Sequence, residues 1–472
     1  MKPIIYQMLP RLWGNGKFAS VDAGSLDYVK GLGVGYIWYT GVIRHATSAT
    51  EKVVKGDAGS PYAIVDYYDV NPYLADNSQK RMQEFLELVE RTHKAGLKVI
   101  IDFVPNHVAR ENLNFGKGDD ATVHWTPEND FYYYPGETLK LPVESDYREF
   151  PAKASGNAFT PAPGINDWWE TVRLNYCDFR TPTWDKMLDI LRFWASKGVD
   201  GFRCDMVEMV PPQFMKWLIA AIKADFPDVV FVAEVYEKNK YRMYVEEVGF
   251  DFLYDKSGLY DVLRAVTCSG ASAREITRNW QFLGDLQPHL LNFLENHDEQ
   301  RIASDFFCGS PEKANAALAV SLLLNTAPFM LYFGQETGER GMDAEGFSGL
   351  DGRTSIFDWA ARHQGPSGNV LPAYKELLAL ASRPAFSEGR TFDLCYCQDG
   401  AFNPDRHFAW LRSDGKHTFL VVSNFGDTAG ITVRIPAEAL DYLGINLEYT
   451  AYTLTVPSFD FQAIELHQAI LA

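Results

Sequence analysis

The chain has 472 residues, which is more than one simple domain needs and fits a large barrel of roughly 250 to 400 residues with attached modules. Hydrophobic residues make up 46% and charged residues 22%, a composition that excludes a disordered chain. The formal charge of −18 argues against a nucleic-acid partner, which would require clustered lysine and arginine, and favours a neutral or cationic substrate.

Eight apolar, strand-like runs recur along the first 333 residues. They cover residues 4–9, 36–42, 99–104, 201–206, 229–235, 250–254, 289–294 and 329–333. Segments with helical periodicity lie between most of them, for example 78–94 and 183–196. This alternation predicts an α/β fold, a (β/α)8 TIM barrel.

Two parts of the chain depart from the alternation. The third strand is followed by about seventy residues rich in Gly, Pro, Asn, Asp and aromatics, which predicts a small inserted domain. After residue 384 short alternating strands predict a C-terminal antiparallel β-sandwich. We therefore expect a catalytic barrel over 1–107 and 181–384, an inserted domain over 108–180 and a C-terminal module over 385–472.

The six cysteines, at positions 177, 204, 268, 308, 395 and 397, lack the spacing of a metal site or a disulfide framework. Cys395 and Cys397 lie in a segment predicted to be a strand. These features favour free thiols in a reducing compartment. No apolar run is long enough to span a membrane and no signal-peptide core is visible, so we expect a cytoplasmic protein with no membrane partner.

Ionisable residues stand at the ends of four predicted strands. Asp205 and Glu234 end two of them, His107 and Asp298 follow two others, and Asp102 lies within the third strand. In a parallel barrel the carboxyl ends of the strands meet at one mouth, where the active site is found. We therefore expect these side chains to lie close together.

The segment from Arg203 to Asp205 carries a further prediction. Because side chains alternate along a strand, Arg203 and Asp205 share one face and Cys204 points to the other. We expect the Arg–Asp pair to face the barrel interior and Cys204 to face the helices.

Four short motifs, in order along the chain, resemble glycoside hydrolase family 13, the α-amylase family. They are Asp102-Phe-Val-Pro-Asn106-His107, Gly201-Phe-Arg203-Cys-Asp205, Glu234 at the end of the fifth strand, and Phe293-Leu-Glu-Asn-His297-Asp298. The resemblance covers nearly the whole chain, from residue 5 into the C-terminal module.

This resemblance implies catalytic roles for three carboxyl groups: Asp205 as nucleophile, Glu234 as general acid/base and Asp298 as transition-state stabiliser. Retaining glycoside hydrolysis needs the first ionised and the second protonated at the start. The positive charge of Arg203 would keep Asp205 ionised, whereas surrounding negative charge would raise the pKa of Glu234. The resemblance also implies that substrate is bound by Tyr62, His107, Arg203 and His297. It further implies that Asp102 and Asn106 support these residues.

Many members of this family bind calcium between the barrel and the inserted domain. The corresponding segment here reads Thr171-Val-Arg173-Leu-Asn175, with an arginine where the family has an aspartate. A guanidinium cannot ligate a cation that requires oxygen donors, and it can replace the ion as an internal charge. We therefore expect no calcium and no other cofactor.

The resemblance predicts an enzyme that hydrolyses α-1,4-glucosidic bonds of maltodextrins, with an oligosaccharide substrate. Two alternatives stay open. A glucanotransferase, or a sucrose- or trehalose-acting transferase or isomerase, would carry the same three carboxylates. A non-catalytic glucan-binding relative would not need them. The sequence says nothing of oligomeric state or of endo versus exo action.

Overall fold

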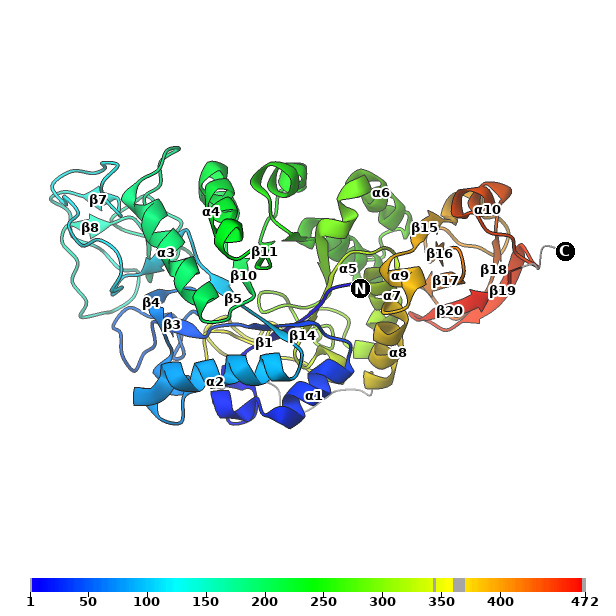
Figure 1. The fold of residues 1–472 in the computed structure, drawn as a ribbon, viewed down its shortest axis with the longest axis horizontal. Helices are drawn as coiled ribbons and strands as arrows, with labels where there is room; N and C mark the ends of the chain where they lie inside the picture. Colours follow the sequence, from blue (N-terminus) through cyan, green and yellow to red (C-terminus); the bar gives the residue numbers. More distant parts are fainter. Residues whose placement is uncertain (1, 343–344, 360–369, 469–472) are drawn as a thin grey trace.

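The computed structural model describes residues 2–342, 345–359 and 370–468 of the chain (Figure 1). Eight parallel strands close into a barrel, in the order β1-β14-β13-β12-β11-β10-β5-β2. Seven lie within the predicted runs and β5 begins one residue before its run, so the TIM barrel is confirmed. The strands are β1 (Ile4–Met8), β2 (Tyr36–Tyr39), β5 (Lys98–Phe103), β10 (Gly201–Cys204), β11 (Val230–Ala233), β12 (Phe252–Tyr254), β13 (Leu290–Phe293) and β14 (Phe329–Tyr332).

The barrel strands read as continuous apolar runs because both of their faces are covered, by the barrel interior and by the surrounding helices. The helix α2 instead shows an apolar stripe, with Phe85, Leu88 and Val89 buried and charged residues outside. The helices of the barrel are α1 (Ala23–Gly31), α2 (Arg81–Lys94), α3 (Pro182–Ser196), α4 (Pro212–Asp225), α5 (Asp261–Cys268), α6 (Arg274–Leu283), α7 (Asn315–Leu323) and α8 (Leu371–Ala381).

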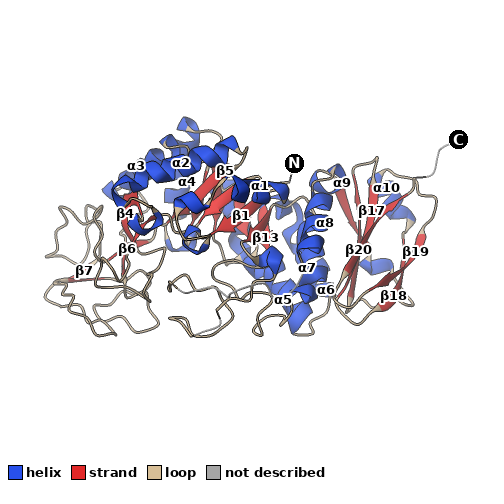
Figure 2. Cartoon of the chain, turned by 90° about the horizontal axis from the view of Figure 1, so that it is seen from below, coloured by secondary structure: helices blue, strands red, loops and turns tan. Residues whose placement is uncertain are grey.

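Long connections follow β2 and β5. The first contains the antiparallel pair β3 (Ile43–His45) and β4 (Ile64–Val70). The second is mostly irregular and forms the end of the molecule opposite the C-terminal module (Figure 2). Its strands are β6 (His107–Ala109), β7 (Tyr133–Tyr134), β8 (Ala152–Lys153) and β9 (Thr171–Arg173), paired β6 with β9 and β7 with β8.

The C-terminal part contains two antiparallel sheets that share one hydrophobic core. A four-stranded sheet has the order β15-β16-β17-β20, and β18 pairs with β19. The elements are α9 (Pro384–Ser387), β15 (Arg390–Asp393), β16 (His407–Ser413), β17 (Thr418–Asn424), β18 (Ala429–Arg434), α10 (Ala437–Leu443), β19 (Ala451–Val456) and β20 (Phe461–Leu466). The predicted strand at Cys395 and Cys397 was wrong, because these residues form one turn of 3-10 helix.

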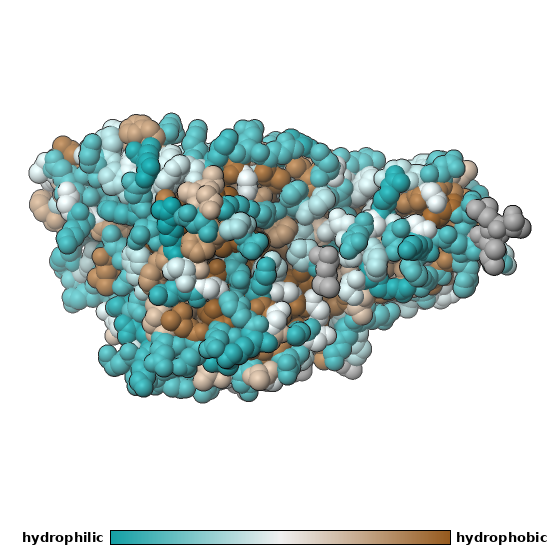
Figure 3. All heavy atoms as spheres, viewed as in Figure 1, coloured by the Kyte–Doolittle hydropathy of each residue, from teal (hydrophilic) through white to brown (hydrophobic). Residues whose placement is uncertain are grey.

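The boundaries 107/108, 180/181 and 384/385 stay predictions, and parts of the predicted domains (1, 343–344, 360–369 and 469–472) lie outside the described residues. The face of the molecule in Figure 3 is covered mainly by hydrophilic residues, with smaller apolar patches between them. None of the helices in the described ranges has the length and apolar character needed to cross a bilayer.

Candidate active site

A cavity of about 400 Å³ opens at the carboxyl ends of the barrel strands. Its walls come from the barrel, the inserted segment and the loop after β14. Five of the predicted site residues line it: Tyr62, His107, Asp205, Glu234 and Asp298. The other four, Asp102, Asn106, Arg203 and His297, are buried around these residues. The structure thus brings all nine together.

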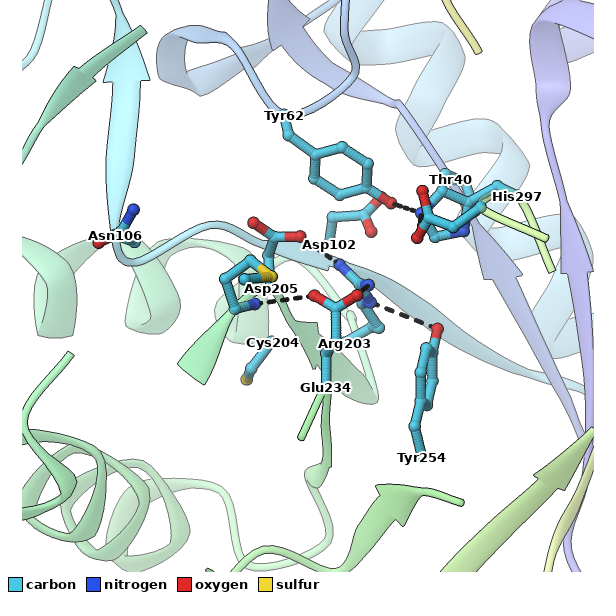
Figure 4. A network of polar contacts seen from close by, with 12 residues as sticks. Thr40, Tyr62, Asp102, Asn106, Arg203, Cys204, Asp205, Glu234, Tyr254 and His297 are labelled. Carbon is cyan, nitrogen blue, oxygen red and sulfur yellow. Dashed lines mark hydrogen bonds and ion pairs between the residues drawn. The ribbon is translucent and has the colours of Figure 1, made fainter. Parts of the chain in front are cut away.

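Arg203 lies at the centre of the polar network (Figure 4). Its guanidinium contacts Asp205 at 2.6 Å and Glu234 at 2.9 Å, and donates to the hydroxyl of Tyr254 at 3.3 Å. Cys204 points away from the carboxylates in Figure 4, and its side chain belongs to the hydrophobic core. The predicted alternation along this strand is confirmed.

The contacts of Arg203 modify the predicted division of charge. Burial raises the pKa of both Asp205 and Glu234, and Arg203 lowers both, since it contacts both carboxyls. The charge of Asp205 adds to the burial that raises the pKa of Glu234. This is the direction that a general acid requires.

Two further donors fix Glu234. The Tyr236 hydroxyl donates to its Oε1 at 2.9 Å, and the Met206 backbone N–H donates to its Oε2 at 2.9 Å. Met206 has φ 45° and ψ 45°, a left-handed conformation that costs a non-glycine residue on the order of 1–3 kcal/mol. The carboxylate of Glu208 accepts the Tyr236 N–H at 2.8 Å. Sequence reasoning missed Tyr236 and Met206, and gave Glu208 no role.

His297 is buried and contacts Gln7, Tyr62 and Asp298 through its two ring nitrogens. The Gln7 side-chain amide lies 2.8 Å from its Nδ1, which therefore accepts, while Nε2 lies 2.5 Å from the Tyr62 hydroxyl and 3.1 Å from Asp298. Burial, followed by the charge of Arg203, lowers the pKa of His297 well below its usual value. Burial and the nearby Glu234 raise the pKa of Asp298 to about 7.

The predicted supporting residues hold loops in place. Asp102 accepts hydrogen bonds from the Trp38 indole at 3.2 Å and the Gly41 N–H at 3.1 Å, and burial raises its pKa to about 7. The side-chain amide of Asn106 donates to the carbonyl of Gly156 at 2.9 Å, which connects the end of β5 to the inserted segment.

The inserted segment covers one side of the cavity with groups that sequence reasoning missed. The Trp168 ring lies 5.1 Å from that of His107, whose pKa is lowered to about 3 by burial and by neighbouring cations. Beside them, Lys55 and Glu170 form an ion pair at 3.0 Å with both side chains almost fully buried. Lys55 and Glu170 are 115 positions apart in the chain, so no local sequence motif marks the pair.

The loop after β2 and the loop after β14 join at the rim of the cavity. The Ala58 N–H donates to the Phe357 carbonyl at 2.9 Å, and the Trp359 N–H donates to the Asp57 carboxylate at 2.8 Å. Gly56 has φ +67°, and a Cβ there would lie 2.2 Å from the Phe357 oxygen. Only glycine permits this close approach.

The residues at the calcium position of the resembling family do not fit a cation. Arg173 donates through its guanidinium to the carbonyls of Met209 at 3.0 Å and Gly156 at 3.4 Å, and lies over the Phe159 ring. These two carbonyl oxygens already accept hydrogen bonds from the positively charged side chain of Arg173. Within the described ranges no cluster of three or more His, Cys, Asp or Glu residues is placed to hold a metal ion.

Comparisons with known proteins identify the family and the fold. Residues 22–367 match the family model described as alpha amylase, catalytic domain. Alpha-amylase 3 of Dictyoglomus thermophilum is 26% identical over 328 residues, which cover 67% of this chain and 59% of that protein. An amino acid transporter heavy chain of Homo sapiens is 26% identical over 282 residues, 55% of this chain and 35% of that protein.

A solved structure shares the fold along nearly the whole chain. The alpha-amylase from Lactobacillus plantarum superposes with a TM-score of 0.70 at 19% identity, covering 98% of each chain. The curated relatives are longer: the chain spans about three fifths of the first and a third of the second.

Proposed function

Because the chain belongs to the α-amylase family, we propose that it is a retaining α-glucan hydrolase that cleaves α-1,4 bonds of maltodextrins through a covalent glycosyl-enzyme intermediate. The observation that carries the proposal is the contact of one guanidinium, that of Arg203, with both Asp205 and Glu234 in a cavity that Asp298 also lines. Binding of a glucan alone would not require this array.

Each carboxyl group has a distinct task in the proposed reaction. The ionised Asp205 attacks the anomeric carbon while Glu234 gives its proton to the departing glycosidic oxygen. Glu234 then removes a proton from the incoming water, which attacks the same carbon and releases Asp205. Asp298 lies beside both groups and stabilises the positive charge that develops on the sugar. Tyr62 and His107 line the space for that sugar.

The alternatives share this site. In a transferase or isomerase a second sugar would replace water in the last step, with the same carboxylates. The alternative of a non-catalytic relative stays open, because one of the relatives is named as an amino acid transporter heavy chain and not as a hydrolase. The buried Asp205 and Glu234, which share the Arg203 guanidinium, favour catalysis, since burying two carboxyls without chemical use is costly.

We test the proposal by incubating the protein with maltoheptaose, isomaltose, sucrose, trehalose and pullulan separately and resolving the products by chromatography. Shorter maltooligosaccharides from maltoheptaose are expected. Longer or isomerised products would favour a transferase or isomerase, and an absence of products would favour the binding relative. A parallel incubation with chelator tests the proposal that no calcium is used, and cell fractionation tests the proposed cytoplasmic location.

The role of the nucleophile has its own test. Asp205→Asn is expected to reduce kcat by several orders of magnitude and to leave sugar binding and folding intact, because an amide is a poor nucleophile. Asp399→Asn serves as the control, since its exposed carboxylate pairs with Arg434 in the C-terminal module. Near-normal activity of Asp205→Asn would place the nucleophile elsewhere.

A further inference from the structure

Two of the six cysteines touch. The sulfur of Cys268, the last residue of α5, lies 3.5 Å from that of Cys308, in the loop between β13 and α7. The six thiols are all free, and Cys395 and Cys397, although closer in sequence, bond to backbone carbonyls instead. A disulfide requires the two sulfurs to approach to about 2.05 Å, so this pair would have to close by about 1.5 Å.

The two thiols differ in access and in charge. Cys268 is exposed to solvent and Cys308 is buried. The hydrogen bond with Cys308, together with the nearby cations Arg264 and Lys313, lowers the pKa of Cys268, which raises its thiolate fraction. Cys268 is therefore the thiol that meets a dissolved oxidant, and Cys308 is the neighbour that resolves the product.

We propose that Cys268 and Cys308 are a reversible redox-modification site, oxidised to a disulfide by a small-molecule disulfide such as oxidised glutathione. The Cys268 thiolate attacks one glutathione sulfur, and the other glutathione leaves as a thiolate. The Cys308 thiol gives its proton to the glutathione thiolate that has left, attacks the Cys268 sulfur and releases the second glutathione. Two protein thiols are oxidised and one glutathione disulfide is reduced to two thiols.

This bond would fasten the loop that carries Asp298. The loop already rests on α5: Arg264 donates to the Gln300 side chain at 2.8 Å and the Phe306 carbonyl at 3.0 Å. The bond would close a ring over a long chain segment, which removes entropy from the unfolded state. Oxidation is therefore expected to raise the Tm of the protein by several degrees. The inference is independent of the proposed reaction.

The test uses the full chain equilibrated in glutathione buffers of increasing oxidised fraction, followed by alkylation and mass spectrometry. The expected result is a loss of two alkylatable thiols, a crosslinked peptide pair containing Cys268 and Cys308, and reversal by dithiothreitol. The thermal midpoint of the oxidised form is expected to exceed that of the reduced form.

Matched variants make the assignment specific. Cys268→Ser, at an exposed position, is expected to abolish the crosslink and the Tm shift, whereas Cys395→Ser leaves both unchanged. A crosslink that persists in Cys268→Ser would overturn the proposal. So would a wild-type protein that keeps all six thiols in fully oxidised glutathione, or one that accumulates glutathione on Cys268 while Cys308 stays free.

Discussion

Glu234 is held by three donors from three different segments: the Arg203 guanidinium, the Tyr236 hydroxyl and the Met206 backbone. A general acid must be protonated before it acts. Each of these donors favours the ionised form of Glu234 and lowers its pKa, so each affects the pH range of activity. Tyr236 is the donor that can be removed without touching the backbone or the nucleophile.

Tyr236→Phe is expected to move the alkaline limb of the kcat/KM profile for maltoheptaose to higher pH. The hydroxyl lowers the pKa of Glu234, so its removal raises that pKa and keeps the acid protonated further into the alkaline range. The loss of kcat/KM at the optimum should stay well below the roughly 10²- to 10⁴-fold contribution of a general acid itself.

Tyr396→Phe is the matched control, because Tyr396 donates to Glu438 at 2.8 Å in the C-terminal module, far from the cavity. Its profile should superpose on that of the wild type. If Tyr236→Phe lowered activity without moving the limb, its role would be structural packing and not control of the Glu234 proton.

The positions of the three proposed catalytic carboxyls could be predicted from sequence because each stands in a short motif at a strand end. Asp205, Glu234 and Asp298 all line the cavity, as expected. Tyr236 and Met206 could not be predicted, because their contacts depend on a left-handed backbone turn and on the loop after β11. The sequence also could not predict that the pKa of Asp205 is raised overall, since this rise depends on burial.

At the scale of elements, β9 connects the inserted segment to the barrel through Arg173. Its guanidinium reaches the Met209 carbonyl in the loop after β10 and the Gly156 carbonyl in the insert. We propose that this side chain takes the structural place of the ion that the resemblance led us to consider. If so, stability depends on the side chain and not on the metal content of the buffer.

Arg173→Met is expected to lower the free energy of unfolding by about 1–3 kcal/mol, because hydrogen bonds from a charged donor are lost. Thermal unfolding measures the effect. Addition of chelator is expected to leave the Tm of the wild type and of the variant unchanged.

Arg434→Met is the control, since this guanidinium is largely exposed and its pair with Asp399 is too. Its change should lie within about 0.5 kcal/mol. A wild-type Tm that falls with chelator and recovers with calcium would contradict the replacement of the ion by Arg173.

The barrel strands were predictable as elements because burial on both faces leaves continuous apolar runs. The outer strands β15 and β20 were missed for the opposite reason: most of their residues are only half-buried or exposed, so no apolar run marks them. The turn at Cys395–Cys397 was read as a strand because its composition resembles one, whereas its conformation is set by the fold.

At the scale of the whole molecule, buried neutral histidines make the folded state sensitive to acid. His45 is enclosed by Asn71 and Tyr73, and burial, with the charge of Arg11, lowers its pKa to about 3. An unfolded histidine binds a proton below about pH 6.5. The stability that a neutral His45 contributes is therefore complete above pH 6.5 and is lost progressively as the pH falls toward 3.

His45→Gln is expected to flatten this dependence. Between pH 5.5 and 4 the free energy of unfolding should fall with decreasing pH in both proteins. The fall should be steeper in the wild type by about 1.4 kcal/mol per pH unit, which corresponds to the uptake of one proton on unfolding. Urea titrations at several pH values measure both slopes. Asp102 and Asp298, whose raised pKa values act with the opposite sign, are present in both proteins and cancel. Parallel slopes would mean that His45 takes up its proton in the folded state.

The helix α7 joins the barrel to the C-terminal module. Residues 316–323 are buried on every side. Two side chains of the module donate hydrogen bonds to backbone carbonyls of this helix: the Ser423 hydroxyl to Ala316 at 3.0 Å and the Trp410 indole to Leu323 at 3.2 Å. A helix without a polar face cannot border water. The module thus covers α7 on the outside of the barrel. Truncation or recombination of the chain at this junction would expose the apolar surface of that helix.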